Sequence, residues 1–209
     1  MITISPSAIK RHAWAFPFEL VMMVSLVLFV WTGRHDHFGL TLFLLVSCMA
    51  LPLIEHIWRL RLSPVLHGLY VAFLFASMFA GEVLDMYAVV SWWDDGLHLI
   101  SGILVGLGAA VWLQVLEQRK AIRSSVWMQV VIVIALGALI AVAWELVEFA
   151  ADQWFGTFMQ RNDLFDTMTD FIYGMLGTII AATLFGRYLR QRHSWGIGRL
   201  LERQRWLND

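Results

Sequence analysis

The chain of 209 residues lacks most of the features that mark familiar classes of soluble protein. Its single cysteine, Cys48, excludes an intramolecular disulfide, so cysteine content indicates no redox compartment. The sequence has no phosphate-binding loop, Ser-His-Asp order, haem motif or basic patch suited to nucleic acid, and we predict no nucleic-acid partner. No small-residue cleavage site follows the apolar stretch after Lys10 and Arg11, so we expect no cleavable signal peptide.

Long apolar runs dominate what is present. Hydrophobic residues make up 59% of the chain and the mean hydropathy is +0.68, which is typical of a membrane protein. We predict an all-α fold, a polytopic bundle of six transmembrane helices at about 15–33, 38–57, 64–84, 94–116, 126–154 and 166–189. Pro64 suits the first turn of the third helix. Residues 1–192 form this transmembrane domain, and 193–209 form a short amphipathic tail on the cytoplasmic leaflet.

The positive residues lie almost entirely on one side of this topology. Thirteen of the 15 Lys and Arg residues precede the first helix, join helices two to three or four to five, or lie at or beyond the end of the sixth helix. Arg34 and Arg161 lie on the other side. The positive-inside rule therefore places both termini in the cytoplasm. We expect a multi-pass protein of the bacterial inner membrane, surrounded by membrane lipids.

Acidic residues gather at the opposite, outer ends of three predicted helices, where an unpaired charge is costly. The clusters are Asp94, Asp95 and His98; Glu145, Glu148 and Asp152; and Asp166 and Asp170. Within each cluster, spacings of three or four residues put side chains on one helical face, where like charges repel. Because the topology brings these three helix ends to one membrane level, we predict a shared polar site.

A divalent cation is the simplest way to offset this negative charge. We predict that the metal ligands are Asp95, His98, Glu145, Glu148, Asp166 and Asp170. Carboxylates with one imidazole suit Mg, Mn or Ca, and also zinc or a di-iron centre, although the Glu-x-x-His pattern of di-iron bundles is absent. Arg161 lies in an outer loop from which it can close over the site. Small residues favour close helix contact around the acids, namely Gly102, Gly106, Gly174 and Gly177.

Structural roles stay open for several of these acids. Asp94 can cap the free amide groups at a helix N-terminus, and Asp152 and Asp163 can be solvated loop residues. For Glu145 and Glu148, the alternative to a metal is a neutral carboxyl group hydrogen-bonded inside the bundle.

Three motifs resemble the YjdF-like bacterial inner-membrane family of unknown function. The segment 93–102 is similar to that family's Asp-x-x-x-His-x-x-x-Gly motif, with Asp94, His98 and Gly102 at the matching positions. The segment 144–149 resembles its aromatic-Glu-x-x-Glu-aromatic motif, and 163–170 resembles its Asp-x-x-Asp-x-x-x-Asp motif. The likeness covers residues 65–185, but the loop after Gly156 departs from the family's Gly-Thr-Gln-Gly-Asp pattern.

The layout is also similar, more distantly, to VanZ-like membrane proteins, a group linked to glycopeptide resistance. Their order is Asp-x-x-x-His on one helix, Glu on the next, then Arg and Asp leading into a Gly-rich last helix. The comparable positions here are Asp94, His98, Glu145 or Glu148, Arg161, Asp166, and Gly174 or Gly177. Neither resemblance implies a known reaction, because a shared fold does not fix function.

Three functions are compatible with such a site, and the sequence leaves open whether the protein is an enzyme. One is a metal-dependent hydrolase acting on a lipid or envelope substrate, with Glu148 as base and Arg161 as a second catalytic residue. Another is a non-catalytic structural or accessory subunit of a larger membrane complex, with other membrane proteins as partners. The third is a cation- or proton-linked transporter, which is disfavoured because few polar residues continue toward the inner face.

Overall fold

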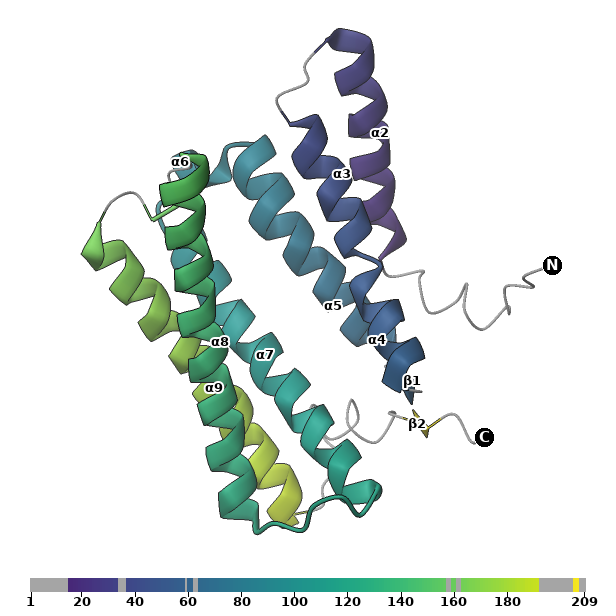
Figure 1. The fold of residues 1–209 in the computed structure, drawn as a ribbon, viewed down its shortest axis with the longest axis vertical. Coiled ribbons are helices and arrows are strands. Elements are labelled where there is room, and N and C mark those ends of the chain that lie inside the picture. The colour runs from purple at the N-terminus through teal and green to yellow at the C-terminus, as the bar shows by residue number, and fades with distance from the viewer. Residues whose placement is uncertain are drawn as a thin grey trace, which may run out of the picture. The chain divides into compact units, whose positions relative to one another are not determined.

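The computed structural model describes residues 15–33, 37–58, 60–61, 64–156, 159–160, 163–191 and 205–206. Apart from loops, these residues are helical, with one antiparallel pair of two-residue strands, β1 (Leu60–Arg61) and β2 (Arg205–Trp206). The predicted helical fold is thus confirmed in outline. The chain divides into unit 1 (Met1–Ser91 with Glu202–Asp209) and unit 2 (Trp92–Leu201), whose helices Figure 1 shows.

Among the described residues, five helical segments are long and apolar enough to cross a membrane, by length and composition. They are Phe38–Ile57, Pro64–Val83, Trp93–Gln118, Val126–Trp154 and Leu164–Gln191. The first predicted span forms a shorter apolar helix of 17 residues, α2 (Phe16–Thr32). A six-span topology with cytoplasmic termini therefore stays a prediction. The predicted tail lies outside the described residues except for the two residues of β2.

Unit 1 is built from short helical pieces. After α2 come α3 (Phe38–Ser47), α4 (Ala50–Trp58), α5 (Pro64–Leu74), the π-helix η1 (Phe75–Val83) and α6 (Met86–Val89). Pro64 opens α5 as predicted, because the first helical position needs no amide donor. The segments predicted at 38–57 and 64–84 each contain a local change of backbone geometry that the apolar pattern did not reveal.

The first change is a turn at Cys48 and Met49, between α3 and α4. Pro52 has no backbone N–H and cannot donate to the carbonyl group of Cys48, four residues earlier. The helix therefore breaks there and resumes as α4, with the Leu53 N–H donating to the Met49 carbonyl oxygen at 3.0 Å. The freed end of α3 gains another partner, since the Tyr70 hydroxyl donates to the Ser47 carbonyl oxygen at 2.9 Å.

The second change is the wider winding of η1. At its end the Leu84 N–H donates to the Phe79 carbonyl oxygen, five residues earlier, at 3.1 Å. Gly81 in η1 leaves room for the Tyr87 ring, which a Cβ at this position would displace. Asp85 then adopts a left-handed backbone with φ of 61°, which is uncommon for a residue with a side chain, before the chain enters α6.

A small apolar core holds the pieces of unit 1 together. Its buried members are Ala15, Met22, Leu44, Cys48, Val71 and Phe79. Ring contacts extend it, with Phe75 5.3 Å from Phe18 and 5.0 Å from Phe79 between centroids. Burial of these side chains at the junctions between α2, α3 and α5 stabilises helices that are individually short.

Unit 2 consists of three long helices, α7 (Trp93–Gln118), α8 (Val126–Phe155) and α9 (Leu164–Gln191). Ser125 begins α8, and its Oγ accepts a hydrogen bond from the Met128 N–H at 3.2 Å. Gly156 ends α8 in a left-handed conformation with φ of 66°, the usual role of glycine after a helix. These two residues mark the ends of α8, which is continuous between them.

Glycines let α7 and α9 form the most extensive helix contact of unit 2. A Cβ at Gly102 would collide with the backbone of Gly174, and one at Gly177 would collide with the Leu99 carbonyl group. The buried Thr178 hydroxyl lies 3.1 Å from both the Gly102 and the Gly174 carbonyl oxygens, so its proton is shared between the two helices. The predicted close contact around these glycines is confirmed, and it fixes the rotation of α7 against α9.

Candidate metal centre

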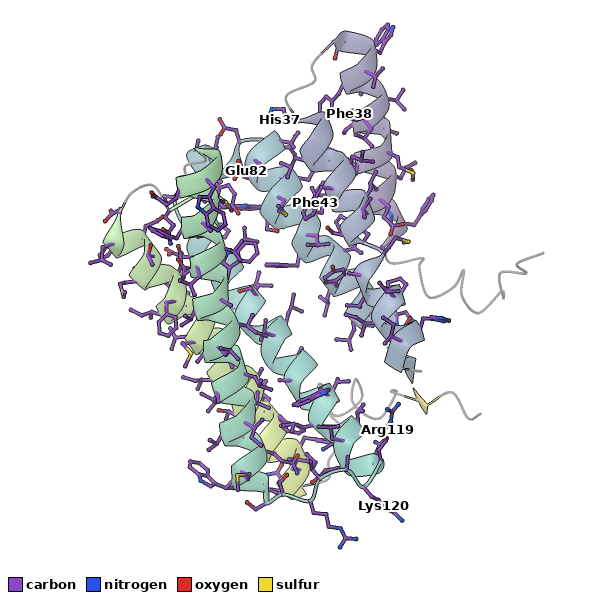
Figure 2. All side chains as sticks on the ribbon, in the orientation of Figure 1. His37, Phe38, Phe43, Glu82, Arg119 and Lys120 are labelled. Carbon is purple, nitrogen blue, oxygen red and sulfur yellow. The ribbon has the colours of Figure 1, made fainter. Side chains whose placement is uncertain are left out.

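Three helix ends meet at one end of unit 2, where α7 begins, α8 ends and α9 begins (Figure 1). Arg119 and Lys120 mark the other end, at the loop between α7 and α8 (Figure 2). The described Lys and Arg residues of unit 2 all belong to that other end and are Arg119, Lys120, Arg123, Arg187 and Arg190. The acidic end therefore has no Lys or Arg side chain among the residues that the structure describes.

Asp94 and His98 lie one turn apart on α7 and face α9. His98 Nε2 is 3.6 Å from Asp94 Oδ1 and 3.7 Å from Asp170 Oδ1. One ligand atom from each of the three residues lies within 4.8 Å of the other two. Octahedral ligands about 2.1 Å from a metal are roughly 3.0 Å apart when adjacent and 4.2 Å when opposite. Small side-chain adjustments are therefore enough to fit these three groups around one ion.

Asp170 is the most deeply buried acid among the described residues, at 3% exposed. Its Oδ1 makes no hydrogen bond to any residue that the structure describes. A buried carboxylate oxygen without a hydrogen-bond donor costs free energy, and the cost is larger in apolar surroundings. A cation beside His98 would supply the missing favourable interaction.

Two glutamates on α8 lie one turn apart and are oriented by neutral donors. Trp144 Nε1 donates to Glu148 Oε1 at 2.7 Å, and Glu148 is 7% exposed. Gln160 Nε2 donates to Glu145 Oε2 at 3.3 Å and to the Glu145 backbone carbonyl at 3.1 Å. Because an indole and an amide carry no charge, these bonds fix the direction of the carboxylates without cancelling their charge.

The remaining acid of the α8 stripe has a different role. Asp152 Oδ1 accepts from the Met159 N–H at 2.8 Å, and Asp152 Oδ2 accepts from the Gln160 N–H at 3.0 Å. This one carboxylate folds the chain back after α8. Asp163 Oδ1 accepts from the Phe165 N–H at 2.9 Å where α9 begins. Both residues thus have the structural, loop-organising type of role that the sequence left open.

Carboxylates from all three helices act electrostatically on one another. The charges that act on Asp170 are those of Asp94, Asp166, Glu145 and Glu148, in decreasing order. Glu145 and Glu148 are in turn acted on by Asp94 and Asp166. At least one acid from each of the three predicted clusters therefore takes part in these interactions, and a shared site stays a prediction.

The structure shows which of the predicted site residues lie close together, which their spacing in the sequence could not. His98 and Asp170 belong to the compact set, and Asp94 completes it, although the sequence favoured Asp95 as the ligand. Asp95 acts electrostatically on His98, and its role as a ligand stays a prediction. Arg161, the predicted second catalytic residue, lies outside the described residues.

Two further residues of the site, Trp144 and Gln160, had no predicted role. Trp144 follows the one-turn spacing to Glu148, so a helical pattern could have suggested the pair. The contact of Gln160 with Glu145 spans fifteen residues and a turn, and no local spacing signals it.

Comparisons with known proteins support a membrane protein. A family model described as "Predicted membrane protein (DUF2238)" matches residues 17–191, which is consistent with the resemblance to YjdF-like proteins. An uncharacterized protein of Thermotoga maritima is 26% identical over 122 residues, or 58% of this chain and 62% of that protein. The match thus spans less than two thirds of the relative's length. No solved structure matches the chain.

Proposed function

Because the chain belongs to the DUF2238 family of predicted membrane proteins, we propose that it is an integral membrane protein that binds a divalent cation in unit 2. Asp94, His98 and Asp170 are the central ligands of this metal centre. The observation that carries the proposal is their convergence from two helices, with ligand atoms within 4.8 Å of one another. Further carboxylate oxygens are available from Asp95, Glu145 and Asp166.

The ligand types narrow the choice of cation. Mg, Mn, Ca, Zn and Fe all bind carboxylates, but an imidazole ligand favours the transition metals over Mg and Ca. A set of two carboxylates and one imidazole is therefore best suited to Mn, Fe or Zn. Electrostatics supports a doubly charged ion, since carboxylates from α7, α8 and α9 all act on the buried Asp170.

Hydrolysis of a lipid or envelope substrate is the reaction that such a centre supports best. A divalent ion supplies Lewis-acid polarisation when bound. Glu148, buried and oriented by Trp144, acts as base, and Arg161 acts on the substrate from the outer loop. Trp154 and Phe165 are largely exposed beside the acidic helix ends, so a lipid can lie along the helices while its head group reaches the acids.

A non-catalytic role in a larger membrane complex is the second candidate. The observation that favours it is the position of the three central ligands on α7 and α9, the two helices that are in most extensive contact. A cation bound by ligands from both helices would then hold α7 and α9 together, and other membrane subunits would pack against unit 2.

Metal analysis of the full chain in detergent tests the proposed centre. After chelation, reloading with Mn²⁺ and removal of excess, we expect about one ion per wild-type chain by inductively coupled plasma mass spectrometry. His98→Gln and Asp170→Asn should lose it. Glu117→Gln is the matched control, because this carboxylate is at the other end of α7, where it accepts from Gln129 at 2.6 Å. No metal in the wild type, or equal metal in Asp170→Asn, contradicts the proposal.

Turnover of phospholipids in mixed micelles separates the two candidate functions. In Mn²⁺-loaded protein, Glu148→Gln should retain the metal and lose roughly 100-fold or more of the hydrolytic rate, the usual contribution of a general base. Turnover unaffected by Glu148→Gln excludes the assigned base. Absence of turnover over a broad lipid panel excludes the hydrolase in favour of the accessory subunit.

A further inference from the structure

The chain folds back at Met159 and Gln160 and reaches α8 at two levels. At the nearer level, both oxygens of Asp152 accept the backbone N–H groups of these two residues. At the farther level, two helical turns deeper, the Gln160 side chain donates to the carboxylate and the backbone carbonyl of Glu145. The four hydrogen bonds form one continuous clamp from the turn to Glu145.

Glu145 takes part in the electrostatic interactions among the acids, so its position matters to the proposed centre. Its carboxylate acts on that of Asp170, and it is acted on by Asp94 and Asp166. Without a cation these like charges repel the Glu145 carboxylate, and the hydrogen bonds from the Gln160 amide restrain its movement. Carboxylates around metal ions generally need such outer hydrogen-bond donors to hold their orientation.

We propose that Gln160 is a positioning residue of the metal centre and that the turn at Met159–Gln160 is coupled to cation binding through Glu145. This inference rests on the proposed metal centre. Gln160 holds Glu145 where its charge attracts the cation, and the cation in turn relieves the repulsion that works against the clamp. Because linkage is reciprocal, the factor by which the closed clamp strengthens cation binding equals the factor by which the cation favours the closed clamp.

Mn²⁺ affinity of the full chain in detergent is the first measurement. Removal of an outer hydrogen bond typically weakens metal binding 10- to 100-fold, so we expect that loss for Gln160→Leu. Gln153→Leu is the matched control, because Gln153 is an exposed glutamine on the last turn of α8. Its affinity should equal that of the wild type. Equal affinities of Gln160→Leu and Gln153→Leu would overturn the inference.

A double-mutant cycle distinguishes positioning from a merely structural role. Glu145→Gln keeps an acceptor for Gln160 but removes the charge through which Gln160 is proposed to act. In that background Gln160→Leu should weaken Mn²⁺ binding much less than in the wild type. An undiminished loss means that Gln160 does not act through the Glu145 charge, and the inference fails.

Hydrogen exchange reports the other side of the linkage. In peptides containing Met159 and Gln160, Mn²⁺ should slow amide exchange in the wild type and in Gln153→Leu, but not in Gln160→Leu. Unchanged exchange on Mn²⁺ binding overturns the coupling while leaving the metal centre intact. If the wild type binds no Mn²⁺ at all, the proposed function itself fails, so the two failures are distinguishable.

Discussion

Unit 1 reaches membrane-spanning lengths by joining short helices, whereas unit 2 uses three continuous helices of 26, 30 and 28 residues. Pro52 and the π-helix η1 interrupt unit 1, and apolar side chains fill its junctions. In unit 2, Gly102, Gly174 and Gly177 bring backbone against backbone. The candidate site lies in the unit with continuous helices, because ligands on separate helices keep a fixed geometry only when those helices cannot rotate or slide.

The beginnings of the helices differ in the same sense. In unit 2, Ser125 caps α8 and Asp163 bonds the first turn of α9, whereas Trp92 precedes α7 without a side-chain capping bond. In unit 1, Ala15 and His37 precede α2 and α3 without a side-chain capping bond (Figure 2 labels His37). Unit 2 is thus fixed by local as well as tertiary interactions, and the two units should respond differently to substitutions.

Crowding the α7–α9 contact should produce the largest effect. Gly102→Ala places a Cβ against backbone atoms of Gly174 and Thr178, which cannot move away as side chains do. We expect a loss of about 3 kcal/mol in the free energy of unfolding and a lower thermal midpoint in detergent. Gly108→Ala, on the same helix with open space around it, should be neutral or slightly stabilising. Equal effects of the two variants would refute the backbone contact.

Cation binding should stabilise unit 2 selectively. Mn²⁺ at 100 times its dissociation constant adds about 2.7 kcal/mol to the free energy of unfolding of the part that binds it. Hydrogen exchange should therefore slow in peptides from α7 and α9 and stay unchanged in peptides from α3 and α5. Asp170→Asn should abolish the protection. Protection spread evenly over both units would place the cation elsewhere.

Loss of a helix cap should have a smaller effect that is again confined to unit 2. Asp163→Ala removes the acceptor for the Phe165 N–H, and Ser125→Ala removes that for the Met128 N–H. Each should cost about 1 kcal/mol, measured as a shift of the unfolding midpoint. Asp163→Asn and Ser125→Thr keep an acceptor oxygen and should retain most of the stability. If Asp163→Asn were as unstable as Asp163→Ala, the loss of stability would come from the missing charge and not from the missing hydrogen bond.

Removal of a single hydroxyl group should lower the free energy of unfolding only slightly, and by a similar amount in both units. Tyr70→Phe in unit 1 and Thr178→Val in unit 2 each remove one hydrogen bond between helical segments. Such bonds in membrane proteins average about 0.6 kcal/mol, so both unfolding midpoints should shift slightly and by similar amounts. A several-fold larger effect at Tyr70 would show that unit 1 depends on polar contacts more than its apolar core suggests.

The lengths of the apolar segments predicted where the helices lie, but not where the helical backbone breaks or changes its winding. The segments at 94–116, 126–154 and 166–189 correspond to α7, α8 and α9 within a few residues. In contrast, the segment at 38–57 hides the turn before Pro52, and that at 64–84 hides η1. A hydropathy window averages over such features, because it records how apolar a segment is and not how its backbone is wound.

The sequence pattern predicted which helix ends carry the acids, but not which of their side chains lie close together. Asp94 and Asp95 are four and three residues from His98, and either spacing is compatible with one helical face. The rotation of α7 decides between them, and the glycine contact with α9 fixes that rotation. The role of Asp152 was equally hidden, because its partners are backbone amides of a turn that has no sequence signature.

The length of α8 has a consequence for the surrounding bilayer. At 1.5 Å per residue its 30 residues span about 45 Å, whereas the hydrocarbon core of a typical bilayer is about 30 Å thick. Glu148 lies seven residues before the end of α8, or roughly 10 Å inward, close to the boundary between head groups and acyl chains. Longer acyl chains would draw the acids into hydrocarbon, and shorter ones would leave them in water. The length of the acyl chains therefore sets how much free energy the acids lose when no cation neutralises them.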